Sequence, residues 1–528
     1  MQTRHIEGQL HVSGQVRPQD IDGLVSAGIT TLICNRPDNE EPGQPSFEEL
    51  AQAARARGIT PFYLPVGGRI APEDQAEAFA KILAENPGPT LAFCRTGNRS
   101  EKVACAARSR SAANGAAQTH APHHKVVIVG GGSAGIAAAA SLLKRSPALD
   151  VAIVEPSEEH FYQPGFTMVG GGVFKQPDTV RKTREVLPKG ASWIRAAVTG
   201  FAPDTNTVEL EGGAAVTYDV LVVALGNRLA WDKIEGLEAA LGQNGVTSNY
   251  RYDLAPYTWQ MVQKLARTPG PRRALFSQPP MPIKCAGAPQ KAMYLSCSEW
   301  EERGVLGDIE VEFHNAGGVL FGVPDYVPAL METVERYGIG LKFGSTLVAV
   351  DGPAREATFR TEDGEITRGF DMLHAVPPQE GNPIIANSPL ADAAGYAEVD
   401  QVTLQSLSWP NVFALGDGCS TPNAKTAAAA RKQAPVVAVN VLAALDGKDP
   451  VAAYDGYGSC PLTVDRGHIV LAEFTYGGKL APSLPKWLID GTKPSRMAWH
   501  LKADALPPIY WHGMLKGREW LVPPAPLL

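Results

Sequence analysis

Cysteine is scarce in this chain, and the spacings typical of metal sites do not occur. The 528 residues contain seven cysteines, an odd number spread from Cys34 to Cys460. A secreted disulfide framework would need more cysteines in a shorter chain, and a structural zinc site would need CxxC or clustered His/Cys spacings. The sequence therefore predicts an intracellular protein without a bound metal, whose cysteines are buried or reactive.

Long basic segments and long apolar segments are also missing. The net charge is −7 and no basic block occurs, which argues against a nucleic-acid partner. No run of about 18 apolar residues occurs, so no segment is expected to span a membrane by itself. The first residues, MQTRHIEGQLHV, lack the apolar core of a signal peptide, so we expect no export by that route.

The composition that is present is that of an ordinary globular protein. Hydrophobic residues make up 44% of the chain and charged residues 20%, which is usual for soluble domains. A chain of this length is too long for a single core, and roughly two to four domains are expected.

One segment carries the pattern of a dinucleotide-binding turn. The apolar run Val126–Val129 is followed by Gly130, Gly132 and Gly135 and then by an Ala-rich helix. The three glycines would allow, in order, a tight turn, the approach of a pyrophosphate, and close packing of helix on strand. The helix N-terminus would hold the phosphates. A second apolar run leads to Glu155, an acid placed to accept a hydrogen bond from a ribose hydroxyl.

Residues 1–110, which precede this turn, are predicted to form a small α/β domain. Strand-like and helical stretches alternate, and Ser46 is the expected N-cap of one helix. The last strand runs into the loop CRTGNRS, from Cys94 through Arg99, and then into a helix. Backbone N–H groups, the helix dipole and Arg99 would lower the pKa of the Cys94 thiol. Cys34 and Cys105 are predicted to be core residues.

Two enzyme classes use a cysteine loop of this kind. Cysteine phosphatases place the arginine six residues after the cysteine, whereas sulfurtransferases place it five residues after, around a cysteine persulfide. The spacing here is five, and the loop resembles a rhodanese-type loop. The upstream elements resemble the dual-specificity-phosphatase-like family of small bacterial domains that carry a CRTG loop. A phosphatase would need an acid soon after the YLPV strand, where Gly67 and Gly68 stand, so sulfur transfer is favoured and phosphate-ester hydrolysis remains the alternative.

Two further strands indicate which dinucleotide is bound. Residues 111–123 have the composition of a flexible linker. After the turn, YDVLVVALG (residues 218–226) and PNVFALGD, which delivers Asp417, are apolar strands that end in small residues. In two-dinucleotide-fold flavoproteins such strands mark the flavin site, and the Asp can bond the ribitol chain. The pattern therefore predicts FAD as the ligand of the first fold.

The second dinucleotide fold is expected to have lost its phosphate-binding turn. Its strand, residues 273–279, is followed by PMPIKCAGAPQKAMYL, in which Gly287 is the single glycine and Cys285 lies before a helix. A nicotinamide donor has no obvious pyrophosphate seat there, and the first fold carries no CxxxxC redox pair. The flavin must be reduced by another donor.

Taken together, these stretches resemble the sulfide:quinone oxidoreductases, particularly the type found in mitochondria and many proteobacteria. The resemblance spans about residues 125 to 475 and rests on VEPSEEHFYQP, PIKCAGAPQKAMYLS, MLHAVPP, SPLADAAGYAEVD, PNVFALGD, NAKTAAAA, YDGYGSCPL and LAEFTY. It implies two redox cysteines, Cys285 and Cys460, on the flavin face where sulfide reacts. Lys284 and Lys291 flank Cys285 and would favour its thiolate.

The resemblance also implies the reaction. Sulfide would attack a disulfide or sulfur-bridged form of the cysteine pair and leave a persulfide, whose sulfur passes to a thiol or sulfite, while two electrons pass to FAD and then to a quinone. The Cys94 loop would handle the persulfide sulfur. An NAD(P)H-dependent persulfide or disulfide reductase is the alternative function.

The family positions predict the FAD contacts as well. Besides the three glycines, they fall at Ser133, Ala134, Glu155, Gln163, Val198, Asp417, Lys425 and Thr426. Lys425, at a helix start, would stabilise the anionic reduced flavin. Cys419, close to the expected flavin, and Cys297 are predicted to be structural.

The last segment, residues 481–528, differs in composition from the rest. It holds four of the nine tryptophans, Trp487, Trp499, Trp511 and Trp520, mixed with Lys and Arg. That mixture favours a membrane-interface anchor rather than a span, which suits an enzyme that meets a lipid-soluble quinone. The alternatives are an extension packed on the body and a homodimer contact. The expected layout is a cysteine-loop domain at 1–110, a linker, an FAD-binding domain at 124–480 and this segment, with the protein attached peripherally to the cytoplasmic membrane.

Overall fold

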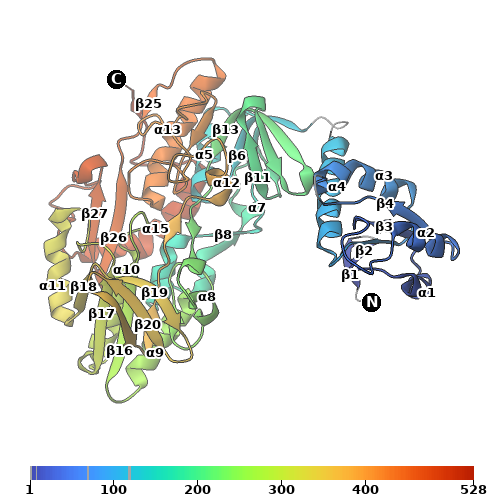
Figure 1. Cartoon of the computed structure of the whole chain (residues 1–528). Coiled ribbons are helices and arrows are strands. Elements are labelled where there is room, and N and C mark those ends of the chain that lie inside the picture. The colour runs from blue at the N-terminus through green and yellow to red at the C-terminus, as the bar shows by residue number, and fades with distance from the viewer. Residues whose placement is uncertain (1–2, 8, 68–69, 117–120, 528) are drawn as a thin grey trace. The chain divides into compact units, whose positions relative to one another are not determined.

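The computed structural model describes residues 3–7, 9–67, 70–116 and 121–527 (Figure 1). The chain divides into two compact units. The first, here called the N-terminal unit, comprises Met1–Ala121 with Gly212–Ala215. The second, the C-terminal unit, comprises Pro122–Glu211 and Val216–Leu528.

The N-terminal unit is built on a five-stranded sheet in the order β1-β2-β5-β3-β4. Among the strand pairs that the structure describes in this sheet, β1–β2 is antiparallel and the others are parallel. The three strands predicted from the sequence are confirmed as β3, β4 and β5, whereas β1 and β2 were not predicted. The strands are β1 Thr3–Glu7, β2 Leu10–Ser13, β3 Thr31–Cys34, β4 Thr60–Tyr63 and β5 Thr90–Phe93.

Four α-helices accompany this sheet: α1 Ile21–Ser26, α2 Phe47–Arg55, α3 Ala76–Glu85 and α4 Asn98–Ala116. The predicted N-cap of α2 is confirmed, because Ser46 and Glu49 form a reciprocal capping box. Strands β3 and β5 are parallel neighbours, with Cys34 beside Phe93. Their carboxyl ends therefore meet at one edge of the sheet, and the loop after β3 lies against the Cys94 loop.

The C-terminal unit begins with a first dinucleotide-type fold. Its sheet has the order β10-β7-β6-β13-β12-β11, with β24 paired to the free edge of β13. Helices α5 and α13 pack side by side (Figure 1). The strands are β6 His123–Val129, β7 Val151–Val154, β10 Ala191–Ile194, β11 Val198–Ala202, β12 Thr207–Leu210, β13 Ala215–Val223 and β24 Val412–Ala414, and the helices are α5 Ser133–Arg145 and α13 Ala427–Leu445.

The second fold of this unit is a parallel sheet in the order β15-β22-β16-β17-β18. Its predicted first strand is confirmed as β16. An antiparallel sheet, β19-β20-β21, stands beside it. The elements are β15 Val246–Thr247, α9 Ala255–Arg267, β16 Arg272–Gln278, α10 Ala288–Glu302, β17 Ile309–Asn315, α11 Val327–Tyr337, β18 Gly340–Phe343, β19 Thr346–Asp351, β20 Glu356–Thr361, β21 Gly364–Gly369 and β22 Met372–His374.

A hairpin of β26 (Gly458–Asp465) and β27 (His468–Phe474) packs on α10. Cys460 and Leu462 on β26 share a core with Phe276, Trp300 and other apolar residues of the second fold. This packing carries Cys460 to the start of α10. The shorter elements are β8 Glu159–Phe161, α6 Phe166–Gly170, β9 Val180–Lys182, α7 Thr183–Val186, β14 Arg228–Leu229, α8 Leu237–Ala240, β23 Gln379–Glu380, α12 Pro383–Ala386, β25 Ala452–Ala453, α14 Arg496–His500, α15 Leu506–Pro508 and β28 Ala525–Pro526.

One local expectation is wrong. The aromatic and glycine-rich stretch after Glu155 is not expected to be helical, yet α6 forms within it. All five of its residues are buried, including Phe166 and Met168. Tertiary burial of these side chains outweighs the low helix propensity of the stretch.

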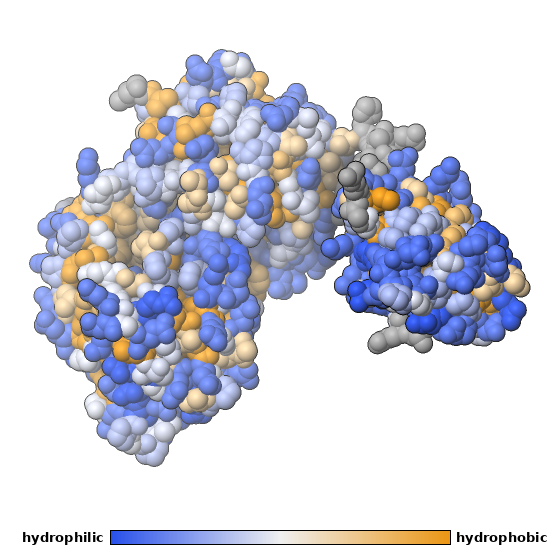
Figure 2. Space-filling model, in the orientation of Figure 1, coloured by the Kyte–Doolittle hydropathy of each residue, from blue (hydrophilic) through white to orange (hydrophobic). Residues whose placement is uncertain are grey.

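The C-terminal segment is divided between core and surface. Trp511 is 7% exposed and packs in the core around α5, while Trp487 is 84% and Trp520 52% exposed. Packing on the body, one of the alternatives for this segment, is therefore confirmed for Trp511. On the face shown in Figure 2, apolar residues lie in small groups among hydrophilic ones. Within the residues that the structure describes, no helix is long and apolar enough to cross a membrane.

Candidate functional site

The dinucleotide turn connects β6 to α5 and is shaped by close backbone contacts. Gly130 has φ +105°, and a Cβ there would lie 2.7 Å from the carbonyl oxygen of Ala224. A Cβ at Gly135 would overlap the carbonyl oxygen of Gly130. At Gly132, by contrast, a Cβ would meet no atom within 4 Å. The tight turn and helix packing thus need glycine, and open space lies where a pyrophosphate would approach.

The polar groups around this turn are suited to a dinucleotide. Gly132 is the N-cap residue of α5 and no side chain caps the helix there, so its first N–H groups remain available to phosphate. Glu155 accepts hydrogen bonds from the N–H of Gly131 and of Ser157, each at 2.8 Å. A carboxylate has further lone pairs, which a ribose hydroxyl can use.

A second group of polar residues lies at the end of β24 and the start of α13. Burial raises the pKa of Asp417, against the lowering effect of the Lys284 and Lys425 charges. Within the described part of the chain the Asp417 carboxylate makes no hydrogen bond or ion pair, so it can accept from a ligand hydroxyl. Lys425 is 8% exposed, and its Nζ donates to Cys419 O at 2.8 Å. Thr426 caps α13 by accepting from the N–H of Ala429.

The remaining predicted contacts lie on three different elements. Ala134, on α5, is 7% exposed and faces Gly416, where a Cβ would lie 2.8 Å from the Ala134 methyl. Gln163 is exposed, and its Oε1 accepts from Lys284 Nζ at 2.7 Å. Val198 is a buried residue of β11. The open turn, the uncapped helix and the unpaired Asp417 carboxylate fit a flavin dinucleotide.

Cys285 and Cys460 are neighbours in the fold although 175 residues separate them. Their sulfur atoms are 3.8 Å apart. Cys285 lies in the turn before α10 with φ +51°, a conformation that non-glycine residues seldom adopt. Its N–H donates to Lys425 O at 2.8 Å, which joins the cysteine turn to the start of α13.

The two cysteines differ in their proton affinity. The hydrogen bond from Cys460 and the charge of Lys291 hold the pKa of Cys285 well below its ordinary value, against the effect of burial. Lys291 is 2% exposed, and its Nζ donates to Cys285 Sγ at 3.1 Å. The hydrogen bond to Cys285, together with burial, raises the pKa of Cys460. Cys285 is therefore the thiolate of the pair and Cys460 the thiol.

Glycine is needed beside the pair. A Cβ at Gly287 would lie 2.6 Å from Cys460 Sγ and would overlap Leu462. The hairpin can bring Cys460 to Cys285 only because this position has no side chain.

One charged residue near the cysteine pair was not predicted from the sequence. Lys502, in the C-terminal segment, is 2% exposed, and its Nζ donates to Pro164 O at 3.0 Å. Burial and the charge of Lys291 lower the pKa of Lys502 to about 7, while Cys285 and Cys460 act in the opposite direction. Nothing in the sequence around this single lysine indicates that it lies near two distant cysteines.

The Cys94 loop forms a second candidate site, in the N-terminal unit. Cys94 is 1% exposed, and the N–H of Gly97 donates to its sulfur at 3.1 Å. Backbone N–H groups of Ser100, Thr96, Arg99 and Gly97 lower the pKa of the thiol, and together they outweigh burial. The loop is therefore built to hold a thiolate or a small anion above the start of α4.

An acid stands beside this loop, although not at the expected position. Glu40, from the loop after β3, accepts from Arg99 Nη1 at 2.5 Å and Nη2 at 2.8 Å. The hydrogen bond from Arg99 lowers the pKa of Glu40 to about 2, aided by Arg36. Glu40 lies beside the Cys94 loop because β3 and β5 end at the same edge of the sheet. It does not belong to the segment after β4, where the phosphatase pattern would place an acid.

The other cysteines have distinct surroundings. Cys34 is buried, as expected, and burial raises its pKa to about 12. Cys297 and Cys419 are buried as well, and Cys419 donates to Gly416 O at 3.1 Å. The expectation that Cys105 is a core residue is wrong, because it lies on the exposed face of α4.

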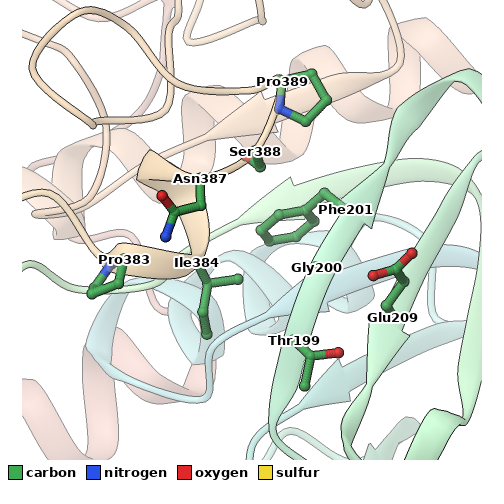
Figure 3. Close-up of a pocket in the computed structure, with 9 residues that line it drawn as sticks. All are labelled: Thr199, Gly200, Phe201, Glu209, Pro383, Ile384, Asn387, Ser388 and Pro389. Carbon is green, nitrogen blue, oxygen red and sulfur yellow. The ribbon is translucent and has the colours of Figure 1, made fainter. Parts of the chain in front are cut away.

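A pocket of about 310 Å³ lies elsewhere on the C-terminal unit (Figure 3). Residues of β11 and β12, including Glu209, line one side, and α12 with the following loop lines the other. None of the predicted site residues is among those that line it. We therefore assign it no part in the chemistry of the cysteines.

Two family models match the chain. The phosphatase-like domain of beta-lactamase hydrolase-like proteins matches residues 2–111, and pyridine nucleotide-disulphide oxidoreductase matches residues 124–263.

Known proteins resemble the two units separately. The mitochondrial sulfide:quinone oxidoreductase of Dictyostelium discoideum is 42% identical over 370 residues, which cover 70% of this chain and 80% of the relative. A beta-lactamase hydrolase-like protein of Agrobacterium fabrum is 36% identical over 99 residues, which are 19% of this chain and 23% of that protein. The solved sulfide:quinone oxidoreductase of Aquifex aeolicus has a TM-score of 0.62 at 19% identity, covers 76% of this chain and 92% of that one, and shows the same fold.

Proposed function

Because the chain belongs to the sulfide:quinone oxidoreductase family, we propose that it oxidises sulfide at Cys285 and Cys460 and delivers two electrons through FAD to a quinone. The observation that carries the proposal is the pair itself, two sulfurs 3.8 Å apart with a buried lysine 3.1 Å from one of them. The family resemblance inferred from the sequence is confirmed. The roles of the individual residues are our inference.

The proposed cycle starts from a disulfide between the two cysteines. Closing it from 3.8 Å to a bond length of about 2.05 Å needs a movement of about 1.8 Å. Hydrosulfide attacks the Cys460 sulfur, a new S–S bond forms, and the bond between the cysteines breaks. Cys460 then carries the persulfide and Cys285 leaves as a thiolate. Lys291 favours this direction because the better-stabilised thiolate leaves faster.

A sulfur acceptor completes the sulfur half of the cycle. Its thiolate attacks the outer sulfur of the persulfide, takes that sulfur, and releases Cys460 as a thiolate. Cys460 then takes up a proton, so the Cys285 thiolate and the Cys460 thiol now hold the two electrons that sulfide brought, and re-forming the disulfide releases them with that proton. When bound, FAD supplies the two-electron acceptor between this pair and the quinone.

The chain's own residues would hold the cofactor at both ends. The open turn at Gly132 and the uncapped start of α5 would receive the pyrophosphate, Glu155 a ribose hydroxyl, and Asp417 the ribitol chain. Lys425 and the N-terminus of α13 would place positive charge near the flavin.

An anaerobic sulfide titration tests the proposal. Sulfide should bleach the visible flavin band of the wild-type enzyme, and a quinone added afterwards should restore it. Cys285→Ser and Cys460→Ser should each abolish the bleaching, whereas Cys297→Ala, on the same helix as the cysteine turn, should leave it intact. Full bleaching of Cys460→Ser by sulfide would refute the proposed pairing.

An NAD(P)H-dependent persulfide or disulfide reductase is the alternative. Against it stands the segment between β16 and α10, residues 279–287, where the cysteine turn replaces a glycine-rich phosphate seat. NADPH should therefore fail to bleach the flavin under conditions in which sulfide succeeds. Bleaching by NADPH alone would favour the reductase.

For the N-terminal unit, we infer that Cys94 accepts the sulfane sulfur. A persulfide needs a stabilised thiolate and a small ring of donors, and the Cys94 loop offers both. Tethering this acceptor to the flavoprotein raises its effective concentration without any new contact. A phosphatase would need a protonated acid at neutral pH, but Glu40, with a pKa of about 2, is ionised there.

Mass spectrometry can distinguish the two roles of Cys94. After turnover with sulfide and quinone, the Cys94 peptide should gain one sulfur atom, while the peptide of the exposed Cys105 should not. Turnover of p-nitrophenyl phosphate that is lost in Cys94→Ser, with no sulfur gained by Cys94, would favour the phosphatase.

We also propose that the C-terminal segment makes a peripheral membrane contact, through which a lipid-soluble quinone is met. Trp487, Met497 and Leu521 expose large apolar side chains on this segment. Liposome co-sedimentation should weaken in Trp487→Ala. If the wild type does not co-sediment with liposomes, a homodimer contact is the better explanation for these exposed side chains, and sedimentation equilibrium can test it.

A further inference from the structure

The C-terminal segment reaches back onto the dinucleotide turn through one hydroxyl group. Tyr510 is 4% exposed, and its Oη lies 2.7 Å from Ser133 Oγ and 2.6 Å from His160 Nε2. The other ring nitrogen, His160 Nδ1, lies 3.1 Å from the carbonyl oxygen of Gly131. Tyr510 is therefore bonded directly to the first residue of α5 and, through His160, to the turn itself.

The donor and the acceptor of each hydrogen bond in this series can be assigned from the group at its end, which can only accept. Burial lowers the pKa of His160 to about 4, so the imidazole is neutral at pH 7 and carries one N–H. Gly131 O can only accept, so Nδ1 must donate to it and Nε2 must accept from the Tyr510 hydroxyl. The remaining lone pairs of Tyr510 then accept from Ser133 Oγ–H. The Ser133 proton is thereby committed to Tyr510.

This chain of bonds fixes the peptide at the centre of the turn. Gly131 donates its N–H to Glu155 at 2.8 Å on one side and has its carbonyl bonded by His160 on the other. In a trans peptide the C=O and the next N–H point in opposite directions. Holding Gly131 O therefore sets the direction of the Gly132 N–H, at the position where the turn is open.

The same segment also grips the far end of α5. Glu519 accepts from Arg145 Nη2 at 2.9 Å and from Ser141 Oγ at 2.6 Å. At Gly517 a Cβ would lie 2.6 Å from the carbonyl oxygen of Ala140, so the chain passes directly against the helix. Residues 510–519 thus lie along α5 from its first turn to its last.

We propose that Tyr510 is a positioning residue for FAD, and that residues 510–519 act as a clasp that shapes the dinucleotide turn. The proposal rests on the proposed function in one respect, namely that the turn holds FAD. It assigns the C-terminal segment a part in cofactor binding as well as at the surface. Because Lys502 belongs to the same segment and lies near the cysteines, one stretch of chain serves both the cofactor seat and the sulfide site.

The test compares two buried tyrosines. Tyr510→Phe keeps the ring and removes the hydroxyl. Tyr337→Phe removes a hydroxyl of equal burial, 4% exposed, which donates to Val464 O in the second fold. For each full-length variant, the apoprotein is titrated with FAD by flavin fluorescence, and melting temperatures are measured with and without FAD. We expect Tyr510→Phe to bind FAD at least tenfold more weakly, and Tyr337→Phe to bind it as the wild type does.

The outcomes separate a positioning role from a structural one. Ligand binding raises the melting temperature according to its affinity, so Tyr510→Phe should lose part of the FAD-induced rise while Tyr337→Phe keeps it. The proposal would be overturned if Tyr510→Phe lowered the melting temperature equally with and without FAD and bound FAD with wild-type affinity. If Tyr510→Phe does not fold, His160→Phe is measured instead. In that variant Gly131 O is the turn atom that loses its hydrogen bond. Wild-type FAD affinity in His160→Phe would overturn the proposal. A wild-type apoprotein that does not bind FAD at all would refute the proposed function instead.

Discussion

Lys291 gives the sharpest test of the electrostatics at the cysteine pair. Its ammonium group lies 3.1 Å from Cys285 Sγ, and the Lys291 side chain is buried while Cys285 is partly exposed. Lys291→Met keeps the length and apolar stem of the side chain and removes the charge and the hydrogen bond. The pKa of Cys285 should rise, because the thiolate loses its nearest counter-charge while burial continues to disfavour it.

The geometry sets the size of this effect. At 3.1 Å and an effective dielectric constant of about 20, two unit charges attract by about 5 kcal/mol. The Cys460 hydrogen bond and the charge of Lys502 remain in the variant and continue to favour the thiolate, so the variant keeps part of the stabilisation. A net loss of about 1.4 kcal/mol already means a factor of ten. We therefore expect the midpoint of the pH dependence of Cys285 alkylation to move up by at least about one pH unit.

Peptide-resolved alkylation measures this change directly. The reduced enzyme is treated with iodoacetamide from pH 5 to 9, and modification of the Cys285 peptide is followed by mass spectrometry, which keeps it apart from the second reactive thiolate, Cys94. Lys284→Met is the matched control, because the Lys284 ammonium is bonded to Gln163 Oε1 at 2.7 Å. An unchanged pH profile in Lys291→Met, or an equal change in the control, would show that Lys291 is not the group that stabilises the Cys285 thiolate.

Three further predictions follow from steric fit and burial. Gly287→Ala should force Cys460 away from its partner and lower sulfide-dependent quinone reduction at least tenfold, measured by steady-state assay. Gly132→Ala should fold normally but retain less FAD after gel filtration, because its methyl group enters the open part of the turn. His374→Phe should narrow the difference in melting temperature between pH 7 and pH 5. Burial lowers the pKa of His374 to about 4, so its stabilising effect is complete above pH 6.5 and declines by about 2 kcal/mol at pH 5.

The first of these predictions has a control variant, and the other two have outcomes that would contradict them. Gly307→Ala adds a methyl group where no atom lies within 4 Å, and it should leave quinone reduction unchanged. Wild-type FAD content in Gly132→Ala would mean that the cofactor does not approach the turn there. A pH dependence of stability that is identical in the wild type and in His374→Phe would show that this imidazole is not the group being titrated.

Local sequence pattern was enough to predict the dinucleotide turn. Strand, glycines and helix follow one another within about 30 residues, as is usual for this motif, so the motif can be recognised without knowledge of distant contacts. The capping box at Ser46 was predictable for the same reason. The helix α6 was not, because its residues become helical only when the rest of the fold buries them.

The cysteine pair could be predicted from the sequence, although not from local pattern. Cys285 and Cys460 could be paired only through the family resemblance, since nothing in a spacing of 175 residues indicates contact. The family comparison supports the resemblance, and the structure places the two sulfurs together. Which of the two carries the negative charge follows from the hydrogen bond between them and from Lys291, six residues along the chain, whose Nζ donates to Cys285 Sγ.

Elements whose parts are adjacent in the chain could be predicted from the sequence: the turn after β6, the Cys94 loop and the strands that lead into them. The side chains that gather around these elements come from distant parts of the chain and depend on the complete fold. Glu40 meets Arg99 because two parallel strands end at the same edge, Lys502 comes close enough for its charge to act on the cysteines because the C-terminal segment folds back, and Tyr510 reaches Ser133 by the same route. Local propensity acts over a few residues, whereas burial and charge act between any residues that the fold brings within a few ångströms of each other.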